Sequence, residues 1–553
     1  GKVQTTFGRL PKNLLPENIS SDVFWALLRC NEVSFNELCR QLSYRAAGDR
    51  NLFDVIRLAY CLLTYIRSTE SIILSGVAGH EVRKGKGSPA PDTHVNPLNQ
   101  RLVVTALDAF FQEQNDDGMW DKGQPIYKNF DKGKGRNMGN AFVFHVNVVG
   151  SLLCALPAEK FRPHLGALEK TLKWIEAHQT VEMITNRCDD EGICYGKPLR
   201  GWSSPNLSPG SGPQAWPTAQ VFKCTSWMKR TIQQLMHNDV LEEFNGVAHS
   251  TNNKNDAASS TSTAFIPTED SWDRLLDADL GDPSKEGGCR TIKSVLEERS
   301  ISPFLTKSID NPSVGAAYSA VLFGPPGTAK TTICEALAQR LGYDFVCIDT
   351  AAFLADGLTN VAARIRYVFS RLMALKNCVI LFDEIEEFVL DRENKDLSME
   401  SRMLTTAMLT AINDLRRNKK SLFFIATNRL RAIDSAVIRP GRFDMHLFVG
   451  TPNLEARVIQ LKHKLLAHPN TKVKARVVAN YRMFLESVWS EDAMFMNYLE
   501  GLQFASACAD IVMSKNELTK DDMSVLLKKQ AAVMTVRGSA RDEYLSSMEL
   551  SRL

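Results

Sequence analysis

The stretch of residues 320–338 constrains the fold of this chain more than any other part of the sequence. Residues 320–323 are apolar and typical of a strand, a Gly- and Pro-rich loop follows, and residues 333–338 are typical of a helix. A phosphate-binding loop requires this order, because backbone N–H groups of the loop and of the helix N-terminus then point at one anion. The sequence therefore predicts that a polyphosphate binds here. The residues expected to surround it are Gly324, Pro325, Pro326, Gly327, Thr328, Ala329, Lys330, Thr331 and Thr332.

Two side chains of this loop are suited to a nucleotide with Mg²⁺. Lys330 would place a positive charge at the β- and γ-phosphates, and the Thr331 hydroxyl would bind the metal ion. Ala329 stands where such loops normally have a glycine, and alanine disfavours a positive φ. We therefore expect nucleotide to fit if the backbone at Ala329 is helical. The alternative, a Gly-rich turn that carries Lys and Thr by chance, is disfavoured by the motifs that follow in the chain.

Length and composition favour a protein of several domains with an ample core. The chain has 553 residues, of which 44% are hydrophobic and 23% charged, and this length suggests roughly three or four domains. A net charge of +3 favours neither a bulk polyanion binder nor an acidic tail. The most apolar stretch, residues 141–157, is short and contains His145 and Asn147, so we expect a buried helix there and no membrane span.

The cysteines and the start of the chain favour a cytoplasmic location. The 12 cysteines are scattered without a CxxC pair, so neither a zinc site nor a disulfide framework is expected. Metal binding by Cys188, Cys194 and a nearby Asp is an alternative, but their spacing matches no standard site. No signal-peptide pattern is visible in the first residues. Together these features favour a reducing, cytosol-like compartment.

Residues 1–247 are expected to form a mainly helical N-terminal domain. Helical patterns occur at residues 21–30, 35–42 and 51–68. Residues 80–97 are rich in Gly, Pro and basic side chains and predict a long loop. A nucleic-acid contact in this loop is the alternative, but no aromatic residues alternate with the charges, so we expect no nucleic-acid partner.

A weak repeat of helix, Gln, Asp-Gly and an aromatic residue lies within residues 100–240, and its second copy includes Asp189-Asp190-Glu191-Gly192. Its helices are expected at 102–111, 165–178 and 217–236, and the associated residues are Gln114, Gly118 and Trp120, then Gln179, Gly201 and Trp202, then Gln214 and Trp216. This order resembles the repeat of α/α toroids such as terpene cyclases and protein prenyltransferases. In such a repeat a glycine turn lets consecutive helices reverse, and the Trp packs over their junction.

Catalysis by this N-terminal region is disfavoured. A cyclase would need an Asp-x-Asp-Asp motif to protonate its substrate, and the region has none. Its acidic pairs, Asp116-Asp117 and Asp189-Asp190, stand in turn-like contexts, where Asp is favoured because it can bond to its own backbone. We therefore interpret both pairs as turn residues.

The composition changes at residues 248–268, which are low in apolar side chains and rich in Ser, Thr and Asn. We interpret this stretch as a linker, with a phosphorylated insert as the alternative. It would connect the helical domain to an α/β nucleotide-binding subdomain at 269–452, followed by a small helical lid at 453–553. The expected fold class is therefore multidomain, a mainly α-helical N-terminal region with a toroid as one arrangement, plus an α/β P-loop domain with a lid.

Three further apolar runs predict strands of the nucleotide-binding sheet. They cover residues 344–348, 377–382 and 421–427. Short apolar runs are typical of buried parallel strands, and ligands bind at the carboxyl ends of such strands. There Asp383 would hold Mg²⁺ through water, and Glu384 would polarise the attacking water. Asn428, a neutral polar residue, would orient that water beside the γ-phosphate.

The residues from Ala426 to Asp444 resemble one family in detail. Ala426-Thr427-Asn428-Arg429, then Ile433-Asp434, then Ile438-Arg439-Pro440-Gly441-Arg442-Phe443-Asp444 is similar to the second region of homology of AAA-family ATPases. The resemblance extends over residues 290–550 and implies ATP and Mg²⁺ as cofactors and a homo-oligomer, expected to be a hexameric ring. It also implies that Arg439 and Arg442 enter the neighbouring subunit's nucleotide site, where a planar guanidinium suits the charge of a transferring phosphoryl group.

Two positions depart from the pattern of that family. The loop that carries a polypeptide-gripping aromatic residue in the family corresponds to Asp356-Gly357-Leu358, which has none. The Asp-Gly-Phe element that relays the nucleotide state between subunits corresponds to Asn413-Asp414-Leu415. Arg537 and Arg541 are candidates for a lid arginine at the nucleotide.

The sequence leaves three functions open. The preferred one is an ATPase that hydrolyses ATP at inter-subunit sites of a ring and remodels or holds a protein partner chosen by the N-terminal helical domain. The alternative is an ATP-gated assembly scaffold or switch with slow turnover. A cyclase-like enzyme regulated by an attached ATPase is less favoured, because the acid motif is missing.

Overall fold

The computed structural model divides the chain into two compact units, Gly1–Met236 and His237–Leu553. The described residues are 21–78, 98–120, 142–188, 194–203, 212–249, 271–280, 290–305, 309, 312, 315–357, 360–390, 399–428, 442–466, 470–489, 492–537 and 539–551. The predicted linker at 248–268 lies outside them from residue 250 onward, so it stays a prediction.

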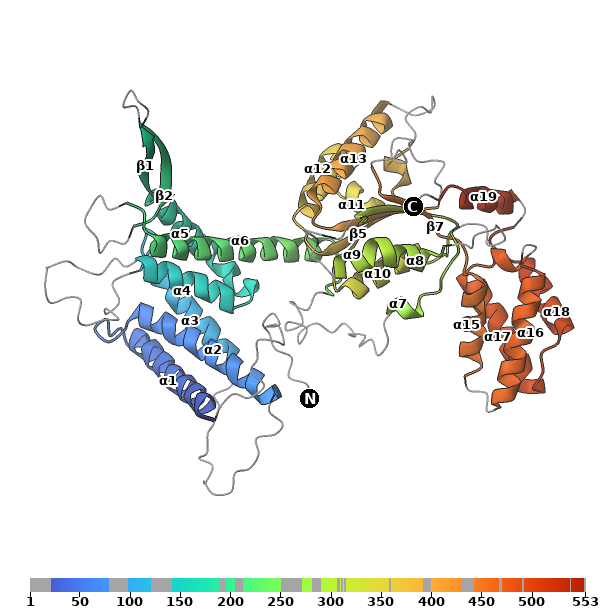
Figure 1. The fold of residues 1–553 in the computed structure, drawn as a ribbon, viewed down its shortest axis with the longest axis horizontal. Helices are drawn as coiled ribbons and strands as arrows, with labels where there is room; N and C mark the ends of the chain where they lie inside the picture. Colours follow the sequence, from blue (N-terminus) through green and yellow to red (C-terminus); the bar gives the residue numbers. More distant parts are fainter. Residues whose placement is uncertain are drawn as a thin grey trace, which may run out of the picture. The chain divides into compact units, whose positions relative to one another are not determined.

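The first unit is an array of helices with a small β-hairpin (Figure 1). Its elements are α1 (Ser21–Ala46), α2 (Val55–Ala78), α3 (Gln100–Gln112), α4 (Phe142–Ala155), η4 (Ala158–His164), α5 (Leu165–Ala177), β1 (Thr180–Cys188), β2 (Cys194–Gly201) and α6 (Ala215–Glu243), which runs on into the second unit. Apolar side chains of α2, α3 and α4 form most of its core.

Three sequence expectations can be compared with these elements. The two short helices expected between residues 21 and 42 are one continuous helix, α1, because the polar residues between them do not break a helix. The apolar stretch at 141–157 forms the buried helix α4, as predicted. No helix among the described residues is both long enough and apolar enough to cross a membrane.

The helix–Trp repeat is visible in two places. The indole Nε1 of Trp120 donates to the carbonyl of Phe110 in α3 at 2.7 Å, and that of Trp202 donates to the carbonyl of Ile175 in α5 at 2.7 Å. Both indoles are buried, so each Trp covers the end of the helix that precedes it. Trp216 differs, since it is 49% exposed. The structure thus supports the repeat at two of three positions, and a closed toroid stays a prediction.

The turn between α3 and Trp120 shows why this repeat needs its glycine. Gly118 has a φ of +90°, and a Cβ there would lie 2.4 Å from the carbonyl oxygen of Lys170. The Asp117 carboxylate accepts a hydrogen bond from the N–H of Met119 at 2.9 Å, which is the turn role expected for this acid. Asp189 and Asp190 lie outside the described residues.

The second unit contains a five-stranded parallel sheet with the strand order β4-β5-β6-β3-β7. The strands are β3 (Ser319–Phe323), β4 (Asp344–Ile348), β5 (Cys378–Asp383), β6 (Leu422–Thr427) and β7 (Met445–Phe448). The first four agree with the predicted strands, and the fold class is confirmed. Strand β7 was not predicted, because its short apolar run follows the arginine motif directly.

Helices cover both faces of this sheet (Figure 1). They are α7 (Ser271–Arg274), α8 (Ile292–Leu296), η6 (Glu297–Ile301), α9 (Ser302–Leu305), α10 (Lys330–Leu341), α11 (Thr350–Leu354), α12 (Val361–Leu372), η8 (Glu386–Phe388) and α13 (Met399–Asn418). Val321 of β3 packs in the core that contains α12 and α13, whereas its neighbour Leu322 packs in the core that contains α10. This alternation explains why the strands are apolar throughout.

The chain ends in a helical lid. Its elements are α15 (Leu454–Lys464), α16 (Thr471–Ser487), η10 (Ala493–Phe495), α17 (Tyr498–Lys515), α18 (Lys520–Ala531) and α19 (Ser539–Met548). The exposed side of α16 carries four basic residues, Lys472, Lys474, Arg476 and Arg482, together with Thr471, Asn480, Glu486 and Ser487. The hydroxyl of Tyr544 in α19 accepts from the N–H of Thr451 at 3.0 Å and so ties the last helix to the chain that leaves β7.

The end of α6 is part of the second unit, so the structural division lies earlier in the chain than the predicted boundary at residue 247. His237 Nε2 lies 2.8 Å from Asp344 Oδ2 at the start of β4, and both side chains are buried. Val247 exchanges two backbone hydrogen bonds with Phe345, at 2.7 and 2.8 Å. The end of α6 and the segment after it therefore cover the edge strand of the sheet.

Candidate nucleotide site

The predicted phosphate loop lies between β3 and α10. Gly324 has a φ of +154°, and a Cβ there would lie 2.3 Å from the carbonyl oxygen of Val449, so only glycine fits. Gly327 has a φ of +76°. Because α10 begins at Lys330, the N–H groups of its first turn follow the loop directly. Such N–H groups have no partner within their own helix and are available to an anion.

Ala329 has a left-handed backbone, with a φ of 65° and a ψ of 30°. The condition set from the sequence, a helical backbone at this residue, is therefore not met. The loop keeps the conformation that a glycine would adopt, so its shape for phosphate is retained. A residue with a Cβ is strained in this region by roughly 1–2 kcal/mol.

Replacing Ala329 by glycine is expected to stabilise the second unit. Relief of the strain outweighs the greater freedom of glycine in the unfolded chain, which leaves a gain of about 0.5–1 kcal/mol. The measurement is the urea midpoint of Ala329→Gly. As a control, Ala479→Gly in the exposed interior of α16 should lose about 1 kcal/mol. An equal loss of folding stability in Ala329→Gly and Ala479→Gly would show that the backbone at Ala329 is not strained.

Lys330 is buried at the centre of the site. Its Nζ donates to the carbonyls of Gly324 at 3.0 Å and Pro325 at 2.9 Å, and to Asn428 Oδ1 at 2.8 Å. Burial lowers the pKa of Lys330 to about 8, although the charges of Asp383, Glu386 and Glu384 act in the opposite direction. The lysine predicted from the loop and the asparagine predicted from the end of β6 are therefore in direct contact.

This lowered pKa predicts that ATP binding weakens above pH 8. Phosphate binding requires the ammonium form, which is half neutral in the free protein at a pH equal to its pKa of about 8. The dissociation constant should rise by up to about tenfold per pH unit between about pH 8 and pH 10, measured calorimetrically in EDTA. The folding stability of the nucleotide-free protein has the opposite pH dependence. The lysine of the unfolded chain keeps its proton to higher pH than the folded one, so the contribution of this group to the free energy of unfolding rises with pH over the same window.

The matched control for this pH series is Lys330→Arg. A guanidinium stays charged throughout this range, so the steep rise in the dissociation constant should disappear. The same slope in both proteins would mean that another group titrates.

The two predicted metal ligands also lie together. Thr331 Oγ1 donates to Asp383 Oδ2 at 2.9 Å. A hydroxyl beside a carboxylate is an all-oxygen donor set, which is the chemistry that Mg²⁺ prefers. The residues present therefore fit a Mg²⁺ ion, with Thr331 and Asp383 as the groups that would hold it.

Glu384 and Asn428 follow the carboxyl ends of neighbouring strands, β5 and β6. Glu384 is exposed and has a φ of 54°, and its carbonyl accepts from Thr350 Oγ1 at 2.6 Å. Glu386, which sequence reasoning missed, accepts through Oε1 from Thr427 Oγ1 at 2.7 Å and from the N–H of Asn428 at 3.1 Å. The sequence contains its signal, an extra acid two residues after Glu384.

The family model described as "ATPase family associated with various cellular activities (AAA)" matches residues 320–451. This chain contains an AAA ATPase domain. The match spans the phosphate loop, β5 with Asp383, and β6 with Asn428. Domains of this family use ATP with Mg²⁺, in agreement with the cofactors expected from the loop.

Curated relatives share this domain with the chain. The ATP-dependent zinc metalloprotease FtsH 1 of Alkaliphilus metalliredigens is 30% identical over 41% of this chain and 41% of its own length. The Cell division cycle protein 48 homolog of Archaeoglobus fulgidus is 32% identical over 27% of this chain and 20% of its own length. The crystal structure of the FIGL-1 AAA domain in complex with ADP is 23% identical, covers 50% of this chain and 92% of its own, and has a TM-score of 0.34. The chain thus spans less than half the length of these two curated relatives.

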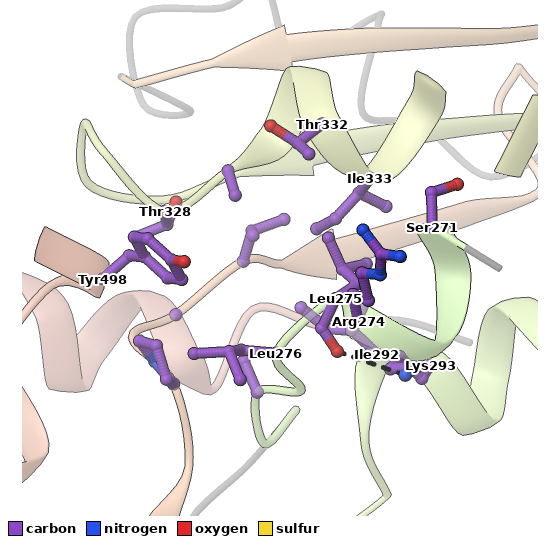
Figure 2. A pocket seen from close by; sticks show the side chains of 15 residues that line it. Ser271, Arg274, Leu275, Leu276, Ile292, Lys293, Thr328, Thr332, Ile333 and Tyr498 are labelled. Atoms are coloured by element: carbon purple, nitrogen blue, oxygen red, sulfur yellow. Dashed lines mark hydrogen bonds between the residues drawn. The ribbon is translucent and has the colours of Figure 1, made fainter. Parts of the chain in front are cut away.

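A cavity of about 300 Å³ opens beside the phosphate loop of the AAA domain (Figure 2). Its lining residues are Ser271, Arg274, Leu275, Leu276, Ala278, Ile292, Lys293, Thr328, Ala329, Thr332, Ile333, Val449, Gly450, Pro452 and Tyr498. This volume is at the lower end of that of ligand pockets, about 300–1,000 Å³. The cavity shares Thr328 and Thr332 with the phosphate loop. Sequence reasoning missed it, since its residues come from five separate segments and only the loop among them carries a motif.

Of the two arginines expected to act between subunits, Arg442 lies among the described residues. Arg439 lies outside the described residues. Arg442 is half-buried, and its Nη1 has no hydrogen-bond partner among the residues that the structure describes. In the lid, Arg541 pairs with Asp492 at 2.6 Å, and Arg537 donates to the carbonyl of Ala532 at 2.8 Å. Neither lid arginine lines the cavity.

Proposed function

We propose that this chain is an ATP-hydrolysing AAA motor that forms a ring and remodels or holds a protein client. The single observation that carries the proposal is the meeting of Lys330, Thr331, Asp383 and Asn428 at the carboxyl edge of the sheet. These side chains come from three separate parts of the sequence. A structural loop without nucleotide chemistry would not require all four to converge.

Each residue has a distinct part in hydrolysis. The N–H groups of the loop and Lys330 bind the β- and γ-phosphates, and Asn428 orients the attacking water. Glu384, exposed at the end of β5, accepts the proton of that water. Thr331 and Asp383 would hold Mg²⁺, which would supply positive charge to the phosphate oxygens.

The inter-subunit part of the proposal is carried by Arg439 and Arg442. An arginine from the neighbouring subunit would complete the site, so hydrolysis would require assembly, most simply into a hexameric ring.

We propose that the protein client contacts the N-terminal helical unit. The ATPase would hold or remodel this client, with little processive threading of its polypeptide. The loop between α11 and α12 exposes Asp356 and Gly357, and Leu358 lies outside the described residues. Phe353, the nearest aromatic residue, is fully buried and stacks on Phe369. A gripping aromatic is therefore absent from the described part of this loop, which favours remodelling with little processive movement of polypeptide.

The rival function is an ATP-gated scaffold, and the concentration dependence of turnover separates the two. The ATPase rate per subunit is measured together with the oligomeric state by light scattering. A motor should turn over ATP faster as the ring assembles and faster again with client. Slow turnover that stays constant after ATP-dependent assembly would favour the scaffold. The cytoplasmic location stays a prediction.

A further inference from the structure

Glu386 links the end of β6 to the turn that follows β5. It lies at the start of η8, and its single oxygen Oε1 accepts from both Thr427 Oγ1 and the N–H of Asn428, at 2.7 and 3.1 Å. Thr427 is 1% exposed, so the shorter of these bonds is shielded from water and correspondingly strong. The carboxylate thus holds the backbone of Asn428 at a defined place relative to Glu384.

Asn428 is in turn bonded to the phosphate-binding lysine. A lysine ammonium has three N–H donors, and Lys330 uses them on Gly324 O, Pro325 O and Asn428 Oδ1. An arriving phosphate can therefore bond to Lys330 only when one of these acceptors is released. Release of Asn428 Oδ1 would free the amide for the attacking water, provided that the backbone of Asn428 does not move away with it.

We propose that Glu386 is a positioning residue for ATP hydrolysis. It keeps the backbone of Asn428 in place while the Asn428 side chain releases Lys330 and binds the attacking water. This inference rests on the proposed function, because it concerns the same site. Glu386 itself touches neither water nor phosphate in this role. Its two hydrogen bonds point to the end of β6, so its effect reaches the reaction through Asn428.

A positioning role makes a prediction that a purely structural role does not. Loss of Glu386 should leave ATP binding nearly intact, because the loop and Lys330 remain. It should lower the rate of the chemical step, because a misplaced water-orienting group no longer holds the attacking water in the reactive geometry. A purely structural acid would instead lower the unfolding temperature and leave the kcat of the remaining folded protein unchanged.

The test compares Glu386→Ala with Glu386→Gln and with Glu387→Ala, an exposed acid in the same turn. In Glu386→Ala we expect kcat to fall by about 10- to 100-fold with KM changed less than about threefold, the range for hydrogen bonds to a charged group. Glu386→Gln should recover most of this loss, since an amide oxygen can accept the same two bonds. Glu387→Ala should behave like the wild-type protein.

Thr427→Val keeps the proposal testable if Glu386→Ala does not fold. This variant preserves the shape of the side chain and removes the 2.7 Å bond, so kcat should fall by about tenfold.

Two results would overturn the inference. One is a kcat of Glu386→Ala equal to that of Glu387→Ala while the wild-type protein hydrolyses ATP. The other is a loss carried entirely by KM. Absence of hydrolysis in the wild-type protein would instead overturn the proposed function, so the two failures are distinguishable.

Discussion

Replacing Arg439 or Arg442 by alanine should leave ATP binding nearly unchanged and slow hydrolysis by roughly 10³–10⁵-fold. The reason is that each guanidinium would act on the phosphoryl group of the neighbouring subunit, where charge spreads over several oxygens in the transition state. This loss corresponds to about 4–7 kcal/mol of activation free energy. The measurements are nucleotide titration for binding and steady-state phosphate release for turnover.

Mixing subunits provides the control for this prediction. An arginine variant combined with Lys330→Ala should regain part of its activity, because an intact loop and an intact arginine then meet at some interfaces. Neither variant should be active alone. If a strictly monomeric preparation of the wild-type protein hydrolyses ATP at the full rate, the site is not shared between subunits.

The second large effect separates phosphate binding from water activation. Lys330→Ala should weaken ATP binding by at least about 100-fold, because the buried ammonium is lost from the phosphate site. Glu384→Gln should bind ATP normally and hydrolyse it at least about 100-fold more slowly, because an amide cannot accept the proton of the attacking water. Both are measured by nucleotide titration and single-turnover hydrolysis.

Glu387→Ala is a suitable control for Glu384→Gln, since both acids are exposed on neighbouring turns. An equal loss of ATP binding in Lys330→Ala and Glu384→Gln would show that Glu384 belongs to the phosphate-binding group of residues and that the proton acceptor lies elsewhere.

The parts of the site that were predicted from the sequence are those encoded by short continuous patterns. Residues 320–338 specify strand, loop and helix within one stretch, and the apolar runs before Asp383 and Asn428 specify buried strands. Parallel strands bring their carboxyl ends to one edge, so the convergence of these side chains followed from fold class alone.

The parts that were missed depend on contacts between distant segments. The cavity combines residues 271–278 and 292–293 with Tyr498, and no local pattern relates these segments. The role of Glu386 depends on the two hydrogen-bond donors at the end of β6, which are distant in the sequence. At Ala329 the local preference for a negative φ was overridden by the geometry of the loop. Tertiary context outweighed local propensity at each of these places.

The end of α6 and the segment that follows it have a practical consequence for anyone who expresses the ATPase portion by itself. A fragment that starts at residue 269 would lack His237, which contacts Asp344, and Val247, which pairs with β4. An open edge strand readily recruits a strand from another molecule. Such a fragment would self-associate through β4, and a sizing column would report this aggregation as if it were ring assembly. Fragments that begin before His237 keep the edge covered and allow nucleotide-dependent assembly to be measured without that artefact.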